Sequence, residues 1–358
     1  MKHIFYRIYA LALILYLLGC SATQAPTGSE QLTIASWNVQ NLFDGSDNGF
    51  EYDEFKNSAG WNDEKYRARL NSISAVLRES FNPDILAVTE VENAAVIQDL
   101  AESCGKDYLW TFFTGDPDNS IGLGVLSKLP LIETRAHSVH FPDGSIPRPV
   151  AEVWVDTGAG PLVLLVCHWK SKRDGERKTE ALRQAGAALV ARRLGEISVE
   201  SPETPVIILG DLNENYDEFT RIEAAYLSAL LPDTDEAVAF IPKIPVSPRP
   251  GFQDFLVISS EKPPRTDFFA ETAGVVYSPW PEEELLGSYY YRDSWETIDH
   301  FLLNAALFNR RGWNYERFRV HAEPPFTNAD GQPHAYNPRT GNGLSDHLPI
   351  VLILGLLH

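Results

Sequence analysis

The sequence predicts an α+β fold in which two packed β-sheets carry helices on their outer faces. Strand-like apolar runs recur from one end of the chain to the other, which favours one core over two domains. Helical periodicity appears between these runs, at residues 62–78 and 179–194. Strands with interspersed helices and many loops are typical of two sheets packed face to face.

The predicted strands are short runs dominated by apolar residues, several of them β-branched. They lie at residues 32–37, 85–89, 122–127, 150–155, 162–167, 206–209, 297–303 and 349–354. The last run (PIVLIL) predicts a buried strand, yet the polar residues Ser345, Asp346 and His347 stand directly before it. An acid and a histidine at the edge of a buried strand suggest a functional role.

One long segment interrupts this pattern. Residues 214–290 contain more proline and aromatic residues and show weaker periodicity than the rest of the chain. We interpret this segment as an insertion between core strands, within a single domain that spans residues 32–358. Long insertions often shape binding sites, although many only decorate the surface.

The N-terminal residues predict export to the bacterial cell envelope. Lys2 and Arg7 precede an apolar stretch at 8–18, which has the length of a signal-peptide core and is shorter than a membrane span. The stretch ends in Leu-Leu-Gly-Cys, which resembles a bacterial lipoprotein box with lipidation at Cys20. We therefore expect residues 1–19 to be a signal peptide, with an uncleaved anchor helix as the alternative.

The predicted mature chain begins with a short polar tether at residues 20–31, and the lipid on Cys20 would hold the protein on a membrane. The other two cysteines, Cys104 and Cys167, could pair in an exported protein. Cys167 lies within an apolar run, however, and this favours a free buried thiol.

The chain is strongly acidic, with a formal net charge of -19. Such a protein gains no general electrostatic attraction towards a polyanion. If the protein acts on phosphates, it therefore needs a bound metal ion or a local basic patch.

The candidate site residues share one position, because each lies at an end of a predicted strand. Ends of strands can converge on one edge of a sheet, where ligands commonly bind. These residues are Asn38, Glu90, His168, Asp211, Asn213, Asp299, Asp346 and His347. Taken singly, each has an ordinary explanation as a turn or helix-cap residue. Taken together, they predict a site.

Three of these residues predict a metal site. Asn38, Glu90 and Asp346 offer amide and carboxylate oxygens, the hard ligands that Mg²⁺ or Mn²⁺ prefers. A zinc site is not predicted, because the sequence contains neither a CxxC nor an HExxH pattern.

The remaining candidates suit hydrolysis of a phosphoester. His347 could activate water as a general base, with Asp299 as the carboxylate that orients it. His168 could stabilise or protonate the phosphate from the other side. Asp211 and Asn213 could position the attacking water and the phosphoryl oxygens.

Taken in order, these motifs resemble the endonuclease/exonuclease/phosphatase superfamily, which includes deoxyribonuclease I. The resemblance runs from residue 32 to residue 354. The motifs that carry it are Trp37-Asn38-Val39-Gln40-Asn41, Thr89-Glu90-Val91-Glu92-Asn93, His168, Gly210-Asp211-Leu212-Asn213, Ile298-Asp299-His300 and Ser345-Asp346-His347. The resemblance implies a four-layer α-β-β-α sandwich with two mixed sheets, and a Mg²⁺-dependent or Mn²⁺-dependent phosphoric ester hydrolase.

The resemblance also implies a role for each matching residue. Asn38 and Glu90 match the metal-binding Asn and Glu. Asp346 matches the Asp close to the metal. The remaining matches belong to the catalytic group: His168, Asp211, Asn213, Asp299 and His347.

Two positions depart from the family pattern. Residues 120–124 contain no glutamate to pair with His168, so the partner of this histidine stays open, with Asp118 nearby in sequence. Thr89 stands where the family more often has glutamine.

A basic segment follows His168 and bears on the substrate. Lys170 and Lys172 belong to an H-W-K-S-K pattern that resembles secreted bacterial nuclease-like members of the superfamily. A solvated loop is the alternative for such a charge run. We expect Lys170, Lys172 and Arg148 to contact the substrate, with a surface position as the alternative for Arg148.

The sequence therefore predicts a nuclease acting on DNA or RNA, as a lipid-anchored monomer without a protein partner. The alternatives are a lipid or sugar phosphoesterase on the same fold and a catalytically idle surface lipoprotein that binds a partner. Aromatic residues at 289–291 and Trp295 leave this choice open. They could stack on bases, contact lipid or pack against the core.

Overall fold

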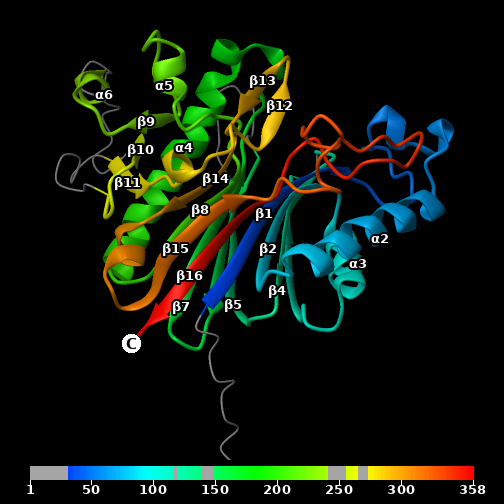
Figure 1. Cartoon of the computed structure of the whole chain (residues 1–358), viewed down its shortest axis with the longest axis horizontal. Coiled ribbons are helices and arrows are strands. Elements are labelled where there is room, and N and C mark those ends of the chain that lie inside the picture. Colours follow the sequence, from blue (N-terminus) through cyan, green and yellow to red (C-terminus); the bar gives the residue numbers. More distant parts are fainter. Residues whose placement is uncertain (1–30, 117–118, 139–147, 241–254, 265–272) are drawn as a thin grey trace, which may run out of the picture.

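The computed structural model describes residues 31–116, 119–138, 148–240, 255–264 and 273–358. Two β-sheets pack face to face, and helices cover their outer faces (Figure 1). The predicted α+β class and four-layer sandwich are confirmed. The predicted signal peptide and Cys20 lie outside the described residues. Within the described part, no helix is both long enough and apolar enough to span a bilayer.

The first sheet contains both ends of the described chain. Its strands are β1 (Gln31–Leu42), β2 (Ile85–Val91), β3 (Trp110–Thr114), β4 (Gly122–Ser127), β15 (Gly312–Val320) and β16 (Ile350–Leu357). They lie in the order β15-β16-β1-β2-β4-β3. β1 runs parallel to β2 and antiparallel to β16, so the sheet is mixed.

The second sheet is larger. Its strands are β5 (Leu131–His137), β6 (Val150–Asp156), β7 (Pro161–His168), β8 (Val206–Asp211), β9 (Leu230–Pro232), β10 (Phe255–Ser259), β11 (Ala273–Tyr277) and β14 (Asp299–Leu303). They lie in the order β5-β6-β7-β8-β14-β11-β10-β9. A separate hairpin is formed by β12 (Tyr289–Tyr291) and β13 (Ser294–Glu296).

The helices flank the sheets. They are α2 (Asp63–Ser80), α3 (Ala94–Cys104), α4 (Glu176–Glu200), α5 (Glu218–Arg221) and α6 (Asp235–Phe240). α3 packs on the first sheet beside α2, and α4 packs on the second sheet across β10 and β11 (Figure 1). Short 3-10 helices lie at Asp53–Phe55, Asn57–Ala59, Lys172–Asp174, Trp280–Glu282 and Ala305–Phe308.

Both helices expected from periodicity are present. α2 begins after Asn62, whose side-chain oxygen accepts a hydrogen bond from the backbone N–H of Lys65 and so caps the helix. α4 begins after Gly175, whose φ of 109° lies in the range that favours glycine.

Every predicted strand is present as well, and β7 shows why these runs are so apolar. Leu162, Leu164 and Val166 pack into the core between the sheets. The alternate residues Leu165 and Cys167 pack under α4. A strand that is buried on both faces has no polar side, so its sequence is apolar without interruption.

The segment 214–290 contributes strands of its own. β9, β10 and β11 extend the second sheet beyond β14, and β10 runs parallel to both of its neighbours. These short strands carry too few residues for their period to stand out in sequence. Residues 241–254 and 265–272 of this segment lie outside the described part of the chain.

The two remaining cysteines are unpaired and buried. Cys104 ends α3 and Cys167 lies in β7. Burial raises the pKa of the Cys104 thiol to about 11, which keeps it protonated and unreactive at neutral pH.

Candidate active site

Asp211, the last residue of β8, lies next to residues of both sheets. Its register partners in the second sheet are His168 of β7 and Asp299 of β14. From the first sheet, Asn38 donates its Nδ2–H to Asp211 Oδ2 at 3.0 Å. Asp211 is only 3% exposed. Residues that lie far apart in sequence therefore converge on one buried carboxylate.

His347 is held by an acid. Its Nδ1 donates to Asp299 Oδ2 at 2.8 Å, and the Ser288 hydroxyl donates to the same oxygen at 2.6 Å. Its Nε2 lies 3.9 Å from Asp211 Oδ2. Burial alone would lower the pKa of His347, but the carboxylates of Asp299, Asp211 and Asp346 raise it to about 10.

His168 has the opposite electrostatic environment. Burial, with the positive charges of Arg148 and His347, lowers its pKa well below the ordinary value. Its Nε2 lies 3.5 Å from Asp211 Oδ2 and 3.8 Å from Glu90 Oε1. Its Nδ1 is buried and has no hydrogen-bond partner among the residues that the structure describes. The neutral ring therefore carries its proton on Nε2, facing the two carboxylates.

No described residue pairs with His168 Nδ1, and Asp118 lies outside the described part of the chain. The two site histidines thus differ in environment, because neighbouring carboxylates raise the pKa of His347 and burial lowers the pKa of His168. Such a pair of shifted pKa values is typical of a catalytic site.

Glu90 reaches the site through an unusual backbone conformation. Its φ is 65°, and the register of β2 with both neighbouring strands shifts around it. A non-glycine residue in this region costs on the order of 1–3 kcal/mol. Its Oε2 accepts the backbone N–H of Asn41 at 3.0 Å, and its Oε1 faces His168.

The predicted metal ligands lie in a region crowded with negative charge. Burial raises the pKa of Asp211 to about 7, and the charges of Asp299 and Glu90 add to the shift. Burial also raises the pKa of Asp346, and Glu90 again adds to it. Oxygen donors in mutual repulsion fit a hard divalent cation, which relieves the repulsion when it binds.

A second group could also hold a metal ion. Asp211, Asp299 and His347 place one ligand atom each within 4.8 Å of one another. In this group, however, His347 Nδ1 already donates to Asp299. A metal bound to either of these two atoms would displace that hydrogen bond. We therefore favour the oxygen donors of Glu90, Asp346 and Asn38.

Arg69 organises this side of the site, although the sequence analysis did not identify it. From α2 it donates to the carbonyls of Val39 at 2.6 Å, Gln40 at 2.5 Å and Asn41 at 2.7 Å. Its guanidinium lies 3.8 Å from the centroid of the Tyr336 ring. The sequence does contain a sign of this role, because Arg69 falls on the apolar face of the predicted helix. A charged side chain buried there needs hydrogen-bond partners.

Asn213 lies in the site but contacts the protein. Its Nδ2 donates to the Trp169 carbonyl at 3.1 Å, and its backbone N–H donates to Asp211 Oδ1 at 2.9 Å. Arg148 also approaches the Trp169 carbonyl, at 3.4 Å. These contacts fix the loop that follows His168.

The two lysines expected to contact substrate are engaged with acids. Lys170 pairs with Asp174 at 2.6 Å and Lys172 pairs with Glu218 at 2.5 Å. Arg173, which follows Lys172, is exposed and forms no ion pair with the residues described.

Arg173 and Arg148 both act on the phenol of Tyr52. Burial raises the pKa of Tyr52, the charges of Arg148 and Arg173 oppose the shift, and Glu90 adds to it. Arg148, Arg173 and Glu90 are therefore all near enough to Tyr52 for their charges to act on its phenol.

A buried ion network lies beneath the site. Arg183 of α4 donates to Glu214 and to Glu180, each at 2.6 Å, and also to the carbonyls of Lys170 and Glu176. Arg183 and Glu214 are fully buried. The network joins α4 to the segments that follow His168 and Asp211.

His300, beside Asp299, contacts the segment that contains Glu214. Its burial predicts that the free energy of unfolding depends on pH. Its Nε2 lies 2.8 Å from the Glu214 carbonyl, and burial lowers its pKa to about 4. Between pH 4 and 6.5 the unfolded chain binds a proton here that the folded protein does not. Stability therefore falls as pH falls, by about 2 kcal/mol from pH 7.5 to pH 5.

We expect the variant His300→Gln to lack this contribution while keeping a donor for the Glu214 carbonyl. Urea unfolding of both proteins at pH 7.5, 6 and 5 measures the difference. Equal losses in the two proteins would contradict the assignment.

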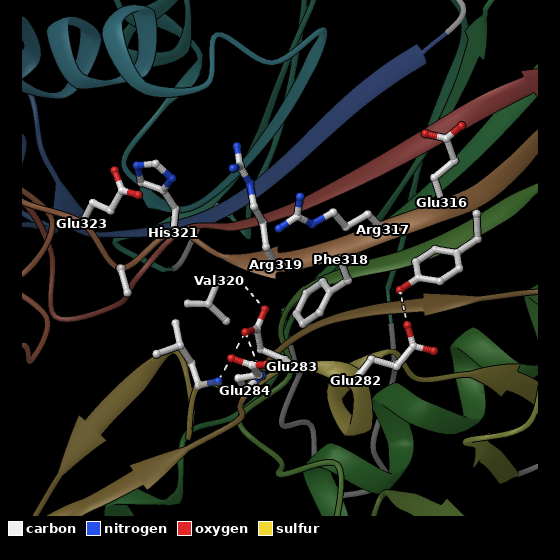
Figure 2. Close-up of a pocket in the computed structure, with 13 residues that line it drawn as sticks. Glu282, Glu283, Glu284, Glu316, Arg317, Phe318, Arg319, Val320, His321 and Glu323 are labelled. Carbon is white, nitrogen blue, oxygen red and sulfur yellow. Dashed lines mark hydrogen bonds between the residues drawn. The ribbon is translucent and has the colours of Figure 1, made fainter.

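A groove of about 540 Å³ lies away from this site, between β15 and the segment around Glu283 (Figure 2). Glu282, Glu283 and Glu284 lie on one side, and β15 with Arg317 and Arg319 lies on the other, together with Glu316 and Glu323. Glu283 accepts the backbone N–H of Val320 at 3.0 Å across it. None of the predicted site residues lines this groove.

A family model described as Endonuclease/Exonuclease/phosphatase family matches residues 33–229. A comparison with curated protein sequences gives no significant match.

Solved structures share the fold at low identity. Truncated Caenorhabditis elegans TDP2 is 15% identical with a TM-score of 0.51, over 91% of this chain and 98% of that chain. An endonuclease/exonuclease/phosphatase family protein from Bacteroides thetaiotaomicron is 16% identical with a TM-score of 0.51, over 92% of this chain and 98% of that chain. D. rerio TDP2, solved with a single-strand DNA product, is 16% identical with a TM-score of 0.51, over 91% of this chain and 100% of that chain.

Proposed function

Because the chain belongs to the endonuclease/exonuclease/phosphatase family, we propose that it is a nuclease that hydrolyses phosphodiester bonds of DNA or RNA. Membership of this family implies a metal-dependent phosphoesterase or nuclease. The observation that carries the proposal is the His347–Asp299 pair beside a group of buried carboxylates.

His347 is the proposed general base. Asp299 accepts from Nδ1 and so leaves Nε2 to accept a proton from the attacking water. The hydroxyl of Ser288 fixes the Asp299 oxygen and thereby the plane of the imidazole. The ring of His347 is 6% exposed, so few competing waters reach it.

Glu90, Asp346 and Asn38 would hold the divalent cation. When bound, Mg²⁺ or Mn²⁺ supplies positive charge that neutralises the phosphate and lowers the proton affinity of His347. His168, neutral and protonated on Nε2, donates a hydrogen bond to a phosphoryl oxygen. Asp211 holds Asn38 in place through its Oδ2.

Two observations support a nucleic acid over other phosphoesters. Arg148 and Arg173 bring positive charge to the rim of the site in a chain whose formal net charge is -19. Such local charge suits a polyanion that the rest of the surface repels. D. rerio TDP2, which is similar in fold, was solved with a single-strand DNA product.

The metal requirement and the substrate can be tested together. We expect the purified protein to cleave DNA or RNA in the presence of Mg²⁺ or Mn²⁺, to lose activity in EDTA and to regain it when Mg²⁺ is added in excess. Gel assays with plasmid, single-stranded DNA and RNA measure this.

Sphingomyelin and inositol phosphates serve as comparison substrates. Hydrolysis of either one without cleavage of nucleic acid would overturn the nuclease proposal in favour of a lipid or sugar phosphoesterase. A folded protein that hydrolyses none of them would indicate a binding protein.

A further inference from the structure

The β12–β13 hairpin carries aromatic rings that lead outward from His347. The Tyr289 ring lies over the His347 ring, with centroids 4.5 Å apart and an interplanar angle of 30°. Tyr291 follows Tyr289 at 6.1 Å and is stacked at 17°. The Arg292 guanidinium lies 5.0 Å from the Tyr291 centroid. We refer to Tyr289 and Tyr291 as the tyrosine stack.

The hairpin is fixed to the catalytic strand end. Tyr289 forms a β-bridge with His347, and the N–H of Leu348 donates to the Ser288 carbonyl at 2.7 Å. On the opposite face Tyr290 packs edge-on against Trp295, with centroids 5.2 Å apart. The Tyr290–Trp295 pair supports the hairpin and leaves the tyrosine stack on the other face.

The tyrosine stack becomes more exposed towards the hairpin turn. Tyr289 is half-buried, whereas Tyr291 is 44% exposed. A large aromatic side chain that is held in a stack and yet this exposed offers a planar surface to a ligand. Its position beside His347 places that surface next to the proposed scissile phosphate.

We propose that the tyrosine stack binds an unpaired nucleobase of the substrate, next to the phosphate that His347 attacks. This inference rests on the proposed nuclease function and deepens it, because it names single-stranded nucleic acid as the substrate class. Bases stack on aromatic side chains through a free face, and in a duplex neighbouring base pairs cover those faces.

The composition of the hairpin favours a nucleobase over a lipid. Its turn carries Arg292 and Asp293 next to the stack, and it lacks the aliphatic side chains that would enter a bilayer. Arg292 at the end of the stack and Arg173 across the site provide charge for the flanking phosphates. Arg173 is near enough for its charge to act on the Tyr289 phenol.

The test compares Tyr291→Ala with Tyr291→Phe. Kinetics are measured on a single-stranded oligonucleotide and on bis(p-nitrophenyl) phosphate, a small diester without a base. We expect Tyr291→Ala to lower the ratio of kcat/KM for the oligonucleotide to kcat/KM for the small diester by roughly 5- to 100-fold, mainly through KM. Tyr291→Phe keeps the ring and should keep most of the ratio.

Leu286→Ala, which removes an exposed apolar side chain just before the hairpin, is the matched control and should leave the ratio unchanged. Binding is measured separately in EDTA, through fluorescence quenching of a single-stranded oligonucleotide that contains 2-aminopurine. We expect this quenching to be strong with the unmodified protein and weak with Tyr291→Ala.

The possible outcomes separate the two proposals. If the protein cleaves single-stranded oligonucleotides and Tyr291→Ala retains both the kinetic ratio and the quenching, the tyrosine stack has no such role. If the unmodified protein neither cleaves nor binds nucleic acid, the nuclease proposal fails, and the inference about the stack fails with it.

Discussion

Replacing His347 with alanine is expected to lower kcat for phosphodiester hydrolysis by roughly 10²–10⁴-fold, the usual contribution of a general base. The geometric reason is the 2.8 Å hydrogen bond from Nδ1 to Asp299, which directs Nε2 towards the site. KM should change little, because the residues proposed to bind phosphate and metal remain. Steady-state kinetics with a saturating metal ion measure both constants.

Asp299→Asn is the companion variant. An asparagine can still contact Nδ1, but it removes the negative charge that raises the pKa of His347. We therefore expect a lower kcat and an activity that depends less on alkaline pH.

His334→Ala, which changes a half-buried histidine outside the cluster, is the control and should retain activity. Near-normal kcat in His347→Ala would exclude this histidine as the base.

Replacing Arg183 with methionine is expected to destabilise the protein by about 3–5 kcal/mol. The substitution leaves the carboxylates of Glu214 and Glu180 buried without their 2.6 Å partners. It also removes the donors to the carbonyls of Lys170 and Glu176. Urea unfolding at pH 7.5 measures the change.

The pH dependence of this variant gives a second test. Burial raises the pKa of Glu214 well above its ordinary value even with Arg183 present. The positive charge of Arg183 lowers the pKa of Glu214, so removing Arg183 raises this folded-state pKa further, and the folded variant takes up a proton here at a higher pH than the unmodified protein does. The stability deficit of Arg183→Met should therefore shrink as the pH is lowered.

Arg177→Met is the matched control, because it makes the same change on an exposed face of α4 and should have little effect. Adding Glu214→Gln to Arg183→Met should restore part of the lost stability, since it removes the unpaired charge. A deficit that stays constant with pH and is not relieved by Glu214→Gln would point to lost packing and not to unpaired charge.

The main lines of the fold could be predicted because its strands are buried on both faces. The run at 162–167 is apolar without interruption, and in β7 alternate residues face the two cores. The same reasoning placed His168 and Asp211 at strand ends, where the register brings them together. Strands β3, β5, β15 and β9 to β13 lie outside the predicted runs, and β9 to β13 have only three to five residues each, which are too few to display a period.

The direction of long side chains could not be predicted. Lys170 lies against Asp174 and Lys172 lies against Glu218, while the contact of both lysines with a substrate stays a prediction. Glu218, the partner of Lys172, is distant in sequence, so no local pattern reveals the pair.

Other features depend on backbone conformation or on contacts between distant segments. The sequence of β2 does not indicate the positive φ of Glu90. The aromatic residues of the hairpin had three possible roles, and the contact between Tyr289 and His347 distinguishes the stack from the Tyr290–Trp295 pair that packs beneath it.

The pairing of β1 with β16 links the order of synthesis to the onset of activity. β1 needs β16 as its antiparallel neighbour, and β16 is the last strand along the described residues. Asp346 and His347 lie just before β16, so a nascent chain that lacks them can neither pair β1 with β16 nor place the proposed general base beside Asp299. Pairings between such distant segments are slow to form in folding. Completion of the first sheet and placement of the proposed general base are thus one event, so the proposed activity can begin only when the sheet is closed.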